Sequence, residues 1–164
     1  MISSSQTASR PALNIILVED DDGDAKALNR AFDRARIANP IKRFVDGVEA
    51  LAFLRGEMHQ VPPPNFVVLS DINMPRKNGI ELLKEIRADP VLHKVLFIVL
   101  TTSADERDIS AAYANNVAGY ILKSNAGGMF VDLMATLDNY WRIVELPDIH
   151  VRKVSDDGPQ HSGH

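Results

Sequence analysis

Five polar side chains follow apolar, strand-like runs of the sequence, and together they could act on a phosphoryl group. Glu19 and Asp20 follow NIILV, Asp71 follows NFVVLS, Thr101 follows VLFIVL, and Lys123 ends GYILK. Clustered carboxylates repel one another unless a hard divalent cation such as Mg²⁺ binds among them through oxygen ligands. An aspartate can attack a phosphoryl group when a metal ion and a nearby cation neutralise the phosphoryl oxygens. The pattern therefore indicates a nucleophilic aspartate beside a magnesium site.

Each residue type has a definite use in such a site. Asp71 would be the nucleophile, Lys123 the nearby cation, and the Thr101 hydroxyl a hydrogen-bond donor to a phosphoryl oxygen. The loop NMPRKNG follows Asp71 and would aim a backbone carbonyl at the metal ion. The expected metal ligands are Glu19, Asp20, Asp71 and the backbone carbonyl of Asn73.

The same residues also have plainer interpretations. An acidic run after a strand is more often a solvated turn or a helix N-cap than a metal site, and we expect Asp21, Asp22 and Asp24 to serve in that way. A threonine after a strand is usually a turn residue, and a lysine there is usually a solvated charge. The shared site is favoured because the acids, the hydroxyl and the lysine all fall at strand ends.

The segments that must position these residues alternate between strand-like and helix-like patterns. The strand-like runs are continuously apolar, which is typical of strands buried on both faces, and the segments between them show helical spacing. Five strands alternating with five helices predict an α/β fold, a doubly wound five-stranded parallel sheet with its ligand site at the carboxyl ends of the strands. The expected strands are Asn14–Val18, Ile41–Val45, Asn65–Ser70, Val95–Leu100 and Gly119–Lys123.

Composition narrows the class of protein. The chain has 164 residues, of which 45% are hydrophobic, so we expect one folded domain. A net charge of −4 argues against nucleic acid as a partner. The sequence contains no Cys, no apolar run near the ~20 residues that span a bilayer, and no signal peptide. These features predict a cytoplasmic protein without a membrane partner. The expected organisation is a flexible leader over 1–12, a domain over 13–146 and a mobile tail over 147–164, with a short extended piece at Ile149–Val154.

The motifs ILVEDD, SDINMPRKNG, VLTTSA and GYILKS resemble, in order and spacing, the receiver domain of two-component response regulators, which has a flavodoxin-like fold. The chain looks most like the single-domain regulators that serve bacterial phytochrome kinases. The resemblance implies Mg²⁺ as cofactor, a sensor histidine kinase as partner, and self-catalysed phosphorylation and slow dephosphorylation as the only reactions. It implies these roles: Glu19 and Asp20 as metal ligands, Asp71 as phosphoacceptor, Asn73 as carbonyl ligand, Thr101 and Lys123 as phosphoryl binders, and Thr101 and Tyr120 as the switch pair.

Two positions depart from the family pattern. Ser124 follows Lys123 where the family usually has a proline after a cis peptide bond, which costs ~3 kcal/mol before any other residue. Glu19 stands where many relatives have Asp, and its extra methylene allows coordination either directly or through a water molecule.

Two other functions of an α/β fold conflict with particular residues of this sequence. A phosphatase with a nucleophilic aspartate needs a second Asp two residues later as general acid, and that position is Asn73. A flavin-binding module needs a phosphate-binding loop after the first strand, where EDDDGD would repel a phosphate. A phosphorelay shuttle, and a degenerate receiver that acts only as a binding module, remain as alternatives.

The last expected helix, Met129–Glu145 before Pro147, has an apolar set too wide for one core-facing stripe. It includes Tyr140, Trp141 and Ile143, so some of these side chains must face outwards. Exposed apolar patches with aromatic members commonly mark interfaces. We therefore expect a homodimer through the fourth helix, the fifth strand and the fifth helix.

Overall fold

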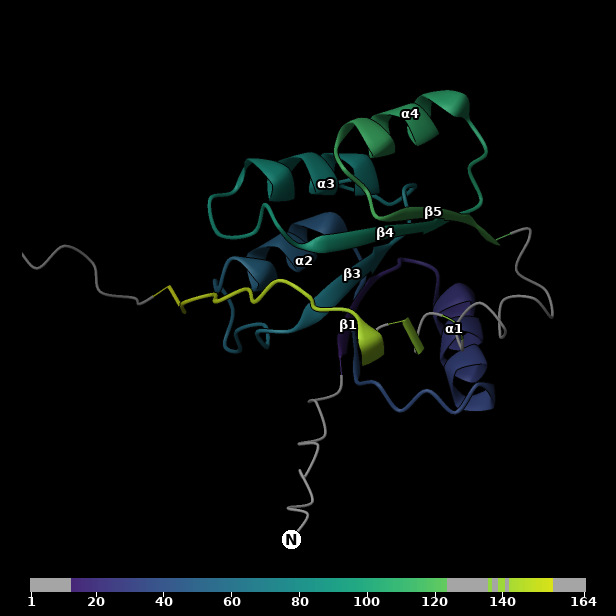
Figure 1. Cartoon of the computed structure of the whole chain (residues 1–164). Coiled ribbons are helices and arrows are strands. Elements are labelled where there is room, and N and C mark those ends of the chain that lie inside the picture. Colours follow the sequence, from purple (N-terminus) through teal and green to yellow (C-terminus); the bar gives the residue numbers. More distant parts are fainter. Residues whose placement is uncertain (1–12, 124–135, 137–138, 141, 155–164) are drawn as a thin grey trace, which may run out of the picture.

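A single five-stranded sheet organises the chain, for which a computed structural model describes residues 13–123, 136, 139–140 and 142–154 (Figure 1). All neighbouring strands are parallel and the order is β2-β1-β3-β4-β5. The strands are β1 (Asn14–Val18), β2 (Ile41–Phe44), β3 (Phe66–Ser70), β4 (Leu96–Thr101) and β5 (Gly119–Leu122). The helices with both ends described are α1 (Asp22–Arg34), α2 (Gly47–Leu54), α3 (Gly79–Ala88) and α4 (Glu106–Ala114). The predicted doubly wound parallel sheet is confirmed.

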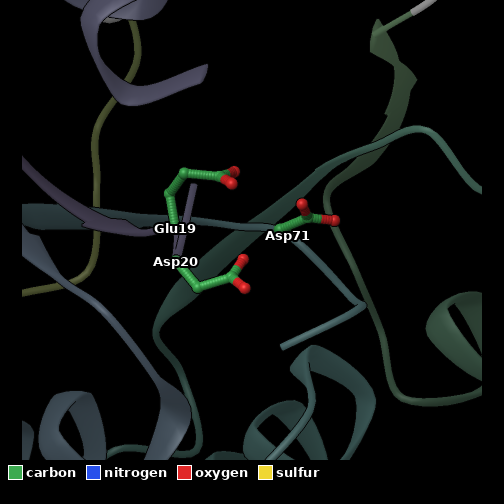
Figure 2. A group of neighbouring side chains, drawn as sticks. All are labelled: Glu19, Asp20 and Asp71. Carbon is green, nitrogen blue, oxygen red and sulfur yellow. The ribbon is translucent and has the colours of Figure 1, made fainter. Parts of the chain in front are cut away.

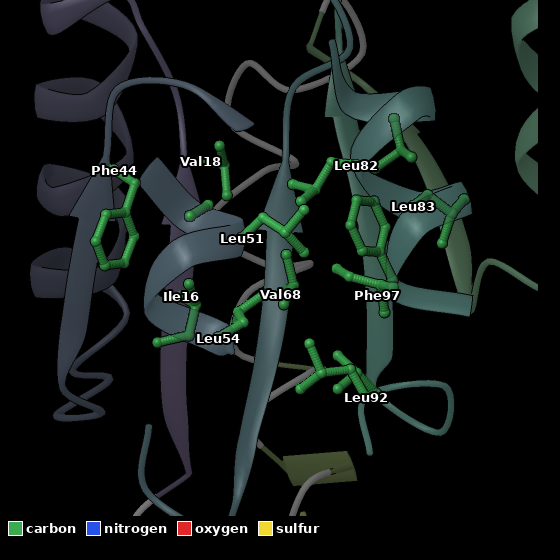
Figure 3. Packing of buried hydrophobic residues seen from close by; sticks show 14 of the residues in the cluster. Ile16, Val18, Phe44, Leu51, Leu54, Val68, Leu82, Leu83, Leu92 and Phe97 are labelled. Atoms are coloured by element: carbon green, nitrogen blue, oxygen red, sulfur yellow. The ribbon is translucent and has the colours of Figure 1, made fainter. Parts of the chain in front are cut away.

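Alternate residues of each strand point to opposite faces of the sheet, and helices cover both faces. On one face, Val68 of β3 and Phe97 of β4 are fully buried against leucines of α2 and α3 (Figure 3). On the other face, Val67 and Leu69 pack with the apolar stripe of α1. Figure 1 shows α1 on the opposite side of the sheet from α2 and α3. This two-sided burial explains why the strand sequences are continuously apolar.

The helices begin at polar residues that cap their first turn. Asp21, Asp46, Asn78 and Asp105 stand directly before α1, α2, α3 and α4, and each side chain accepts a backbone N–H of that turn. Such caps stabilise a helix by about 1 kcal/mol each. Because these helices follow β1, β2, β3 and β4, the caps also fix where each chain segment turns away from the carboxyl edge of the sheet.

Arg87, near the end of α3, ties the start of β4 to the loop before β5. Its guanidinium donates to the backbone carbonyls of His93, Val95, Asn115 and Asn116 at 2.6–2.9 Å. Burial lowers the pKa of this group. The contacts fix the entry of the chain into β5, and therefore the position of the lysine that follows β5.

Strand ends differ from the predicted ones by at most one residue, which is within the ordinary uncertainty of element boundaries. The second strand ends at Phe44, and the side chain of the following Val45 is 44% exposed. The fourth strand includes Thr101, and the fifth ends at Leu122, one residue before Lys123.

Several predictions fall partly or wholly outside the described residues. These are the leader over 1–12, the peptide bond to Ser124, the end of the tail over 155–164, and most of the helix expected over Met129–Glu145. Within that helix, Thr136, Asn139, Tyr140, Arg142 and Ile143 are described and are helical.

The first part of the expected tail packs on the domain and does not extend away from it. Ile149 is 3% exposed, belongs to the same buried cluster as α2 and α3, and donates its N–H to the Pro64 carbonyl at 3.0 Å. Val154 donates to the carbonyl of Gly56 at 2.9 Å. Gly56 has φ +75°, and a Cβ there would lie 2.4 Å from the Arg152 carbonyl oxygen. For the described residues, the extended piece is thus docked beside the end of α2, and the mobility expected for 147–164 stays a prediction.

Candidate phosphoacceptor and metal site

Three carboxylates meet at the carboxyl edge of the sheet, where β1 and β3 end side by side. Glu19 and Asp71 are buried, whereas Asp20 is exposed. One oxygen from each lies within 4.8 Å of the others (Figure 2). The Asp71 N–H donates to the Val18 carbonyl at 3.0 Å, so the β1–β3 ladder continues to the acid itself. The sheet therefore brings together the acids that the sequence placed at two separate strand ends.

Asp71 is held at both carboxylate oxygens. Its Oδ1 accepts the backbone N–H of Ile72 at 2.7 Å, and its Oδ2 accepts the Lys123 ammonium at 2.9 Å. Lys123 stands one residue after β5, and its side chain is only 15% exposed. The lysine thus reaches across β4 to the end of the central strand.

Lys123 also contacts two other acids. Its Nζ lies 2.8 Å from Glu19 Oε2 and 2.8 Å from Asp24 Oδ2. Burial alone would lower the pKa of the ammonium, but the bonds to Asp24, Glu19 and Asp71 raise it well above the usual lysine range. Burial raises the pKa of Glu19, although the bond to Lys123 opposes that effect. The site is therefore an acidic cluster with the Lys123 ammonium at its centre.

Thr101 and Tyr120 are linked through one residue of the loop after β4. Thr101 is fully buried at the end of β4, and its hydroxyl oxygen accepts the N–H of Ser103 at 3.3 Å. The Tyr120 hydroxyl donates to the Ser103 carbonyl at 2.7 Å. Burial raises the pKa of the Tyr120 phenol. The two expected switch residues are thus joined by Ser103, which in turn donates to Asp108 of α4 at 2.6 Å.

Asn73 lies exposed in the loop between β3 and α3, two residues after Asp71. Arg76 ties this loop to the start of α2: its Nε and Nη2 lie 2.8 Å and 2.5 Å from Asp46 Oδ2, and its Nη2 lies 4.0 Å from Glu49 Oε1. Burial would raise the pKa of Asp46, but bonds from the Glu49 N–H and from Arg76 hold it below its usual range. The same carboxylate thus caps α2 and anchors the loop that carries Asn73.

We expect Asp46→Asn to lower the free energy of unfolding by about 1 kcal/mol at neutral pH, since Asn retains the cap but loses the ion pair, and Arg76 is half exposed. A carboxylate whose pKa is lowered in the folded state stabilises it above its unfolded pKa and loses this effect as pH falls. The difference from the parent protein should therefore shrink below about pH 4 in urea denaturation. Asp33→Asn, at an exposed position of α1, is the control. A difference independent of pH would contradict this account.

The sequence profile of the response regulator receiver domain matches residues 15–134. The chain belongs to this family. Response regulator Rcp1 of Synechocystis sp. is 34% identical over 142 residues, which cover 85% of this chain and 96% of Rcp1. The prediction of a receiver domain is confirmed.

Two solved receiver structures are close to this one. The phosphorylated cyanobacterial phytochrome response regulator RcpA is 31% identical, with a TM-score of 0.72, covering 84% of this chain and 100% of RcpA. The Mn²⁺-bound form of response regulator Rcp1 is 34% identical, with a TM-score of 0.71, covering 84% of this chain and 99% of the solved chain. This receiver is therefore related to phytochrome response regulators.

Sequence reasoning missed three contacts in and around this receiver site. Asp24 was assigned to a solvated turn, yet it binds the site lysine; Asp22, assigned in the same way, pairs with Arg43 at 2.7 Å. The role of Asp46 in holding the Asn73 loop was also not foreseen. No local signal identifies these contacts, because their partners are 21, 30 and 99 residues apart in the sequence. Asp21, by contrast, caps α1 as expected.

In the part of the chain that the structure describes, no helix has the length and apolar character needed to span a bilayer.

Proposed function

We propose that this receiver takes a phosphoryl group from a phosphohistidine of a sensor histidine kinase onto Asp71. The observation that carries the proposal is the contact between the buried Asp71 carboxylate and the Lys123 ammonium at 2.9 Å. A buried carboxylate that keeps a fixed cation beside one oxygen can attack phosphorus while the cation neutralises the phosphoryl oxygens. Attack forms the new O–P bond of an acyl phosphate and breaks the P–N bond of the phosphohistidine. The imidazole leaves with the electron pair and then takes up a proton.

The residues present fit a divalent cation. The donors are carboxylate oxygens, which hard cations such as Mg²⁺ and Mn²⁺ prefer. We propose Mg²⁺ as the physiological ion, and the Mn²⁺-bound structure of Rcp1 supports a site for divalent cations. When bound, the ion neutralises negative charge on the phosphoryl oxygens. The residues that would hold it are Glu19, Asp20, Asp71 and the carbonyl of Asn73.

Thr101 and Tyr120 would report the phosphorylated state. A phosphoryl group on Asp71 adds negative charge at the strand ends and would draw the Thr101 hydroxyl towards it. The Thr101 oxygen now accepts the Ser103 N–H, and the Ser103 carbonyl accepts the hydrogen bond of the Tyr120 hydroxyl. Moving Thr101 would therefore disturb the Tyr120 contact and bias a two-state equilibrium of the loop and α4.

The test is transfer of label from autophosphorylated histidine kinases, beginning with bacteriophytochromes, because similar solved structures include bacteriophytochrome response regulators. We expect one phosphoryl group per chain, dependence on Mg²⁺, and slow loss as water attacks phosphorus and releases phosphate and the free carboxylate. Passage of the label to a histidine of another protein would identify a phosphorelay shuttle. Failure with every kinase and with acetyl phosphate would leave only a binding module and overturn the proposal.

The output surface that we propose is a homodimer face built from α4, β5 and the C-terminal helix. Among described residues, Tyr113 of α4 is 54% exposed, Tyr140 50% and Ile143 81%. Large apolar side chains with this exposure favour an interface.

Light scattering at micromolar concentration should give a mass near twice 18.1 kDa. Ile143→Glu should lower that mass, because a charge in an apolar interface must be desolvated. Val48→Glu, at a 39% exposed valine of α2 outside the proposed face, should leave it unchanged. A monomer before and after phosphorylation would refute the dimer.

A further inference from the structure

Lys123 binds three carboxylates, one for each N–H that its ammonium can donate. A lysine ammonium has three N–H donors. Its Nζ lies 2.8 Å from Glu19, 2.8 Å from Asp24 and 2.9 Å from Asp71. Each donor is therefore in use in this state of the protein. A phosphoryl oxygen that is to bind Lys123 must displace one of these acids.

Asp24 differs from the other two partners. It lies in the first turn of α1, its side chain is 47% exposed, and it is not one of the three acids that lie within 4.8 Å of one another. The cap of α1 uses its backbone N–H, which Asp21 Oδ1 accepts at 2.7 Å, and leaves its carboxylate free for Lys123. Glu19 and Asp71 have side chains only 3% and 10% exposed.

Exposure decides which acid yields most easily. A carboxylate released from a buried ion pair remains desolvated, whereas an exposed one is hydrated on release. Asp71 itself becomes part of the acyl phosphate in the proposed reaction, so of the two other partners, Glu19 and Asp24, the exposed Asp24 is the one whose displacement costs least. Its negative charge also opposes the approach of a phosphoryl group, because the two anions would share the same cation.

We propose that Asp24 is a positioning residue that holds Lys123 in the unphosphorylated state and competes with the phosphoryl group for it. The proposal rests on phosphorylation of Asp71 as described above. It gives Asp24 a function in setting how readily small anionic phosphodonors react. The acid that the sequence assigned to a solvated helix start would then restrain phosphorylation.

The test compares two phosphodonors on the full chain in the presence of Mg²⁺. Acetyl phosphate is strongly anionic, whereas phosphoramidate carries less net negative charge because its nitrogen is protonated. Asp24→Asn should raise the second-order rate with acetyl phosphate on the order of threefold, as expected for loss of a half-exposed ion pair. The rise with phosphoramidate should be smaller, and the acetyl phosphate rate should depend less on salt than in the parent.

Two further variants separate this role from general effects. Asp22→Asn removes the same charge from the same helical turn. Because Asp22 pairs with Arg43 and its side chain is 80% exposed, the ratio of the acetyl phosphate rate to the phosphoramidate rate should stay at the parent value. Asp24→Glu keeps a carboxylate at position 24, so its rate with acetyl phosphate should be nearer to that of the parent than the rate of Asp24→Asn is. Circular dichroism verifies that the variants fold.

An unchanged or lower acetyl phosphate rate in Asp24→Asn overturns the inference, since Lys123 would then need Asp24 to stay in place. An equal rise with both donors also overturns it, because a change in structure and not in charge competition would be responsible. Both outcomes leave phosphorylation of Asp71 intact. Failure of the parent protein to react with any donor instead refutes the proposed function, and the inference with it.

Discussion

Asp71→Asn should abolish uptake of a phosphoryl group from acetyl phosphate, while the variant remains folded. The asparagine side chain would keep the acceptor oxygen that now binds the Ile72 N–H at 2.7 Å, so the end of β3 should hold its position. It would lose the second carboxylate oxygen and the charge that makes an aspartate nucleophilic. Intact mass spectrometry after incubation with acetyl phosphate and Mg²⁺ should show one added group in the parent protein and none in the variant.

Another acid near the carboxyl edge of the sheet, Asp22, supplies the control for this experiment. Asp22 is acidic and exposed, yet it pairs with Arg43 and not with the lysine. Asp22→Asn should therefore gain the phosphoryl group at close to the parent rate. Labelling of Asp71→Asn at the parent rate would move the acceptor to another residue, and the exposed Asp20 would be the next candidate.

The fold could be predicted because its strands carry their signal locally. The runs around Val67 and Phe97 are continuously apolar since both faces of the sheet are covered, and such runs are visible without any partner. Parallel strands also end at one common edge, so the acid after β3 and the lysine after β5 could be placed together from order alone. The positions of Asp71 and Lys123 follow from these two rules.

What the sequence did not reveal depends on distant partners. Asp24 and Asp22 look alike in the acidic run, and only the packing of α1 against the sheet sends one to Lys123 and the other to Arg43. Asp46 is recognisable as a helix cap, but its bond to Arg76 spans 30 residues. The docking of the tail was missed because Ile149 and Val151 alternate with polar residues, a pattern that indicates an extended piece but does not identify the surface on which it packs.

The close approach of β3 and α3 requires a glycine at position 79. A Cβ on Gly79 would lie 2.1 Å from the Asp71 carbonyl oxygen and 3.0 Å from the Cα of Ile72. Both are backbone atoms at or next to the acid of the site, so relief of the clash requires the loop itself to move. The Gly79 N–H also donates to the Ile72 carbonyl at 2.9 Å, which holds the two elements at this distance.

Gly79→Ala should therefore lower the free energy of unfolding by about 3 kcal/mol, the upper end for overpacking a buried site. The better helix propensity of alanine offsets at most about 1 kcal/mol of this. Urea denaturation measures the loss, and an unchanged slope would assign it to the folded state.

Gly119→Ala is the matched control, because a Cβ there meets its nearest atom, Ile98 Cγ2, at an ordinary 4.0 Å. It should change stability by less than about 1 kcal/mol. If Gly79→Ala remained as stable as Gly119→Ala and accepted phosphoryl at the parent rate, the loop would have room to move. The backbone contact at Asp71 would then be a consequence of the fold and not a condition for placing the acceptor.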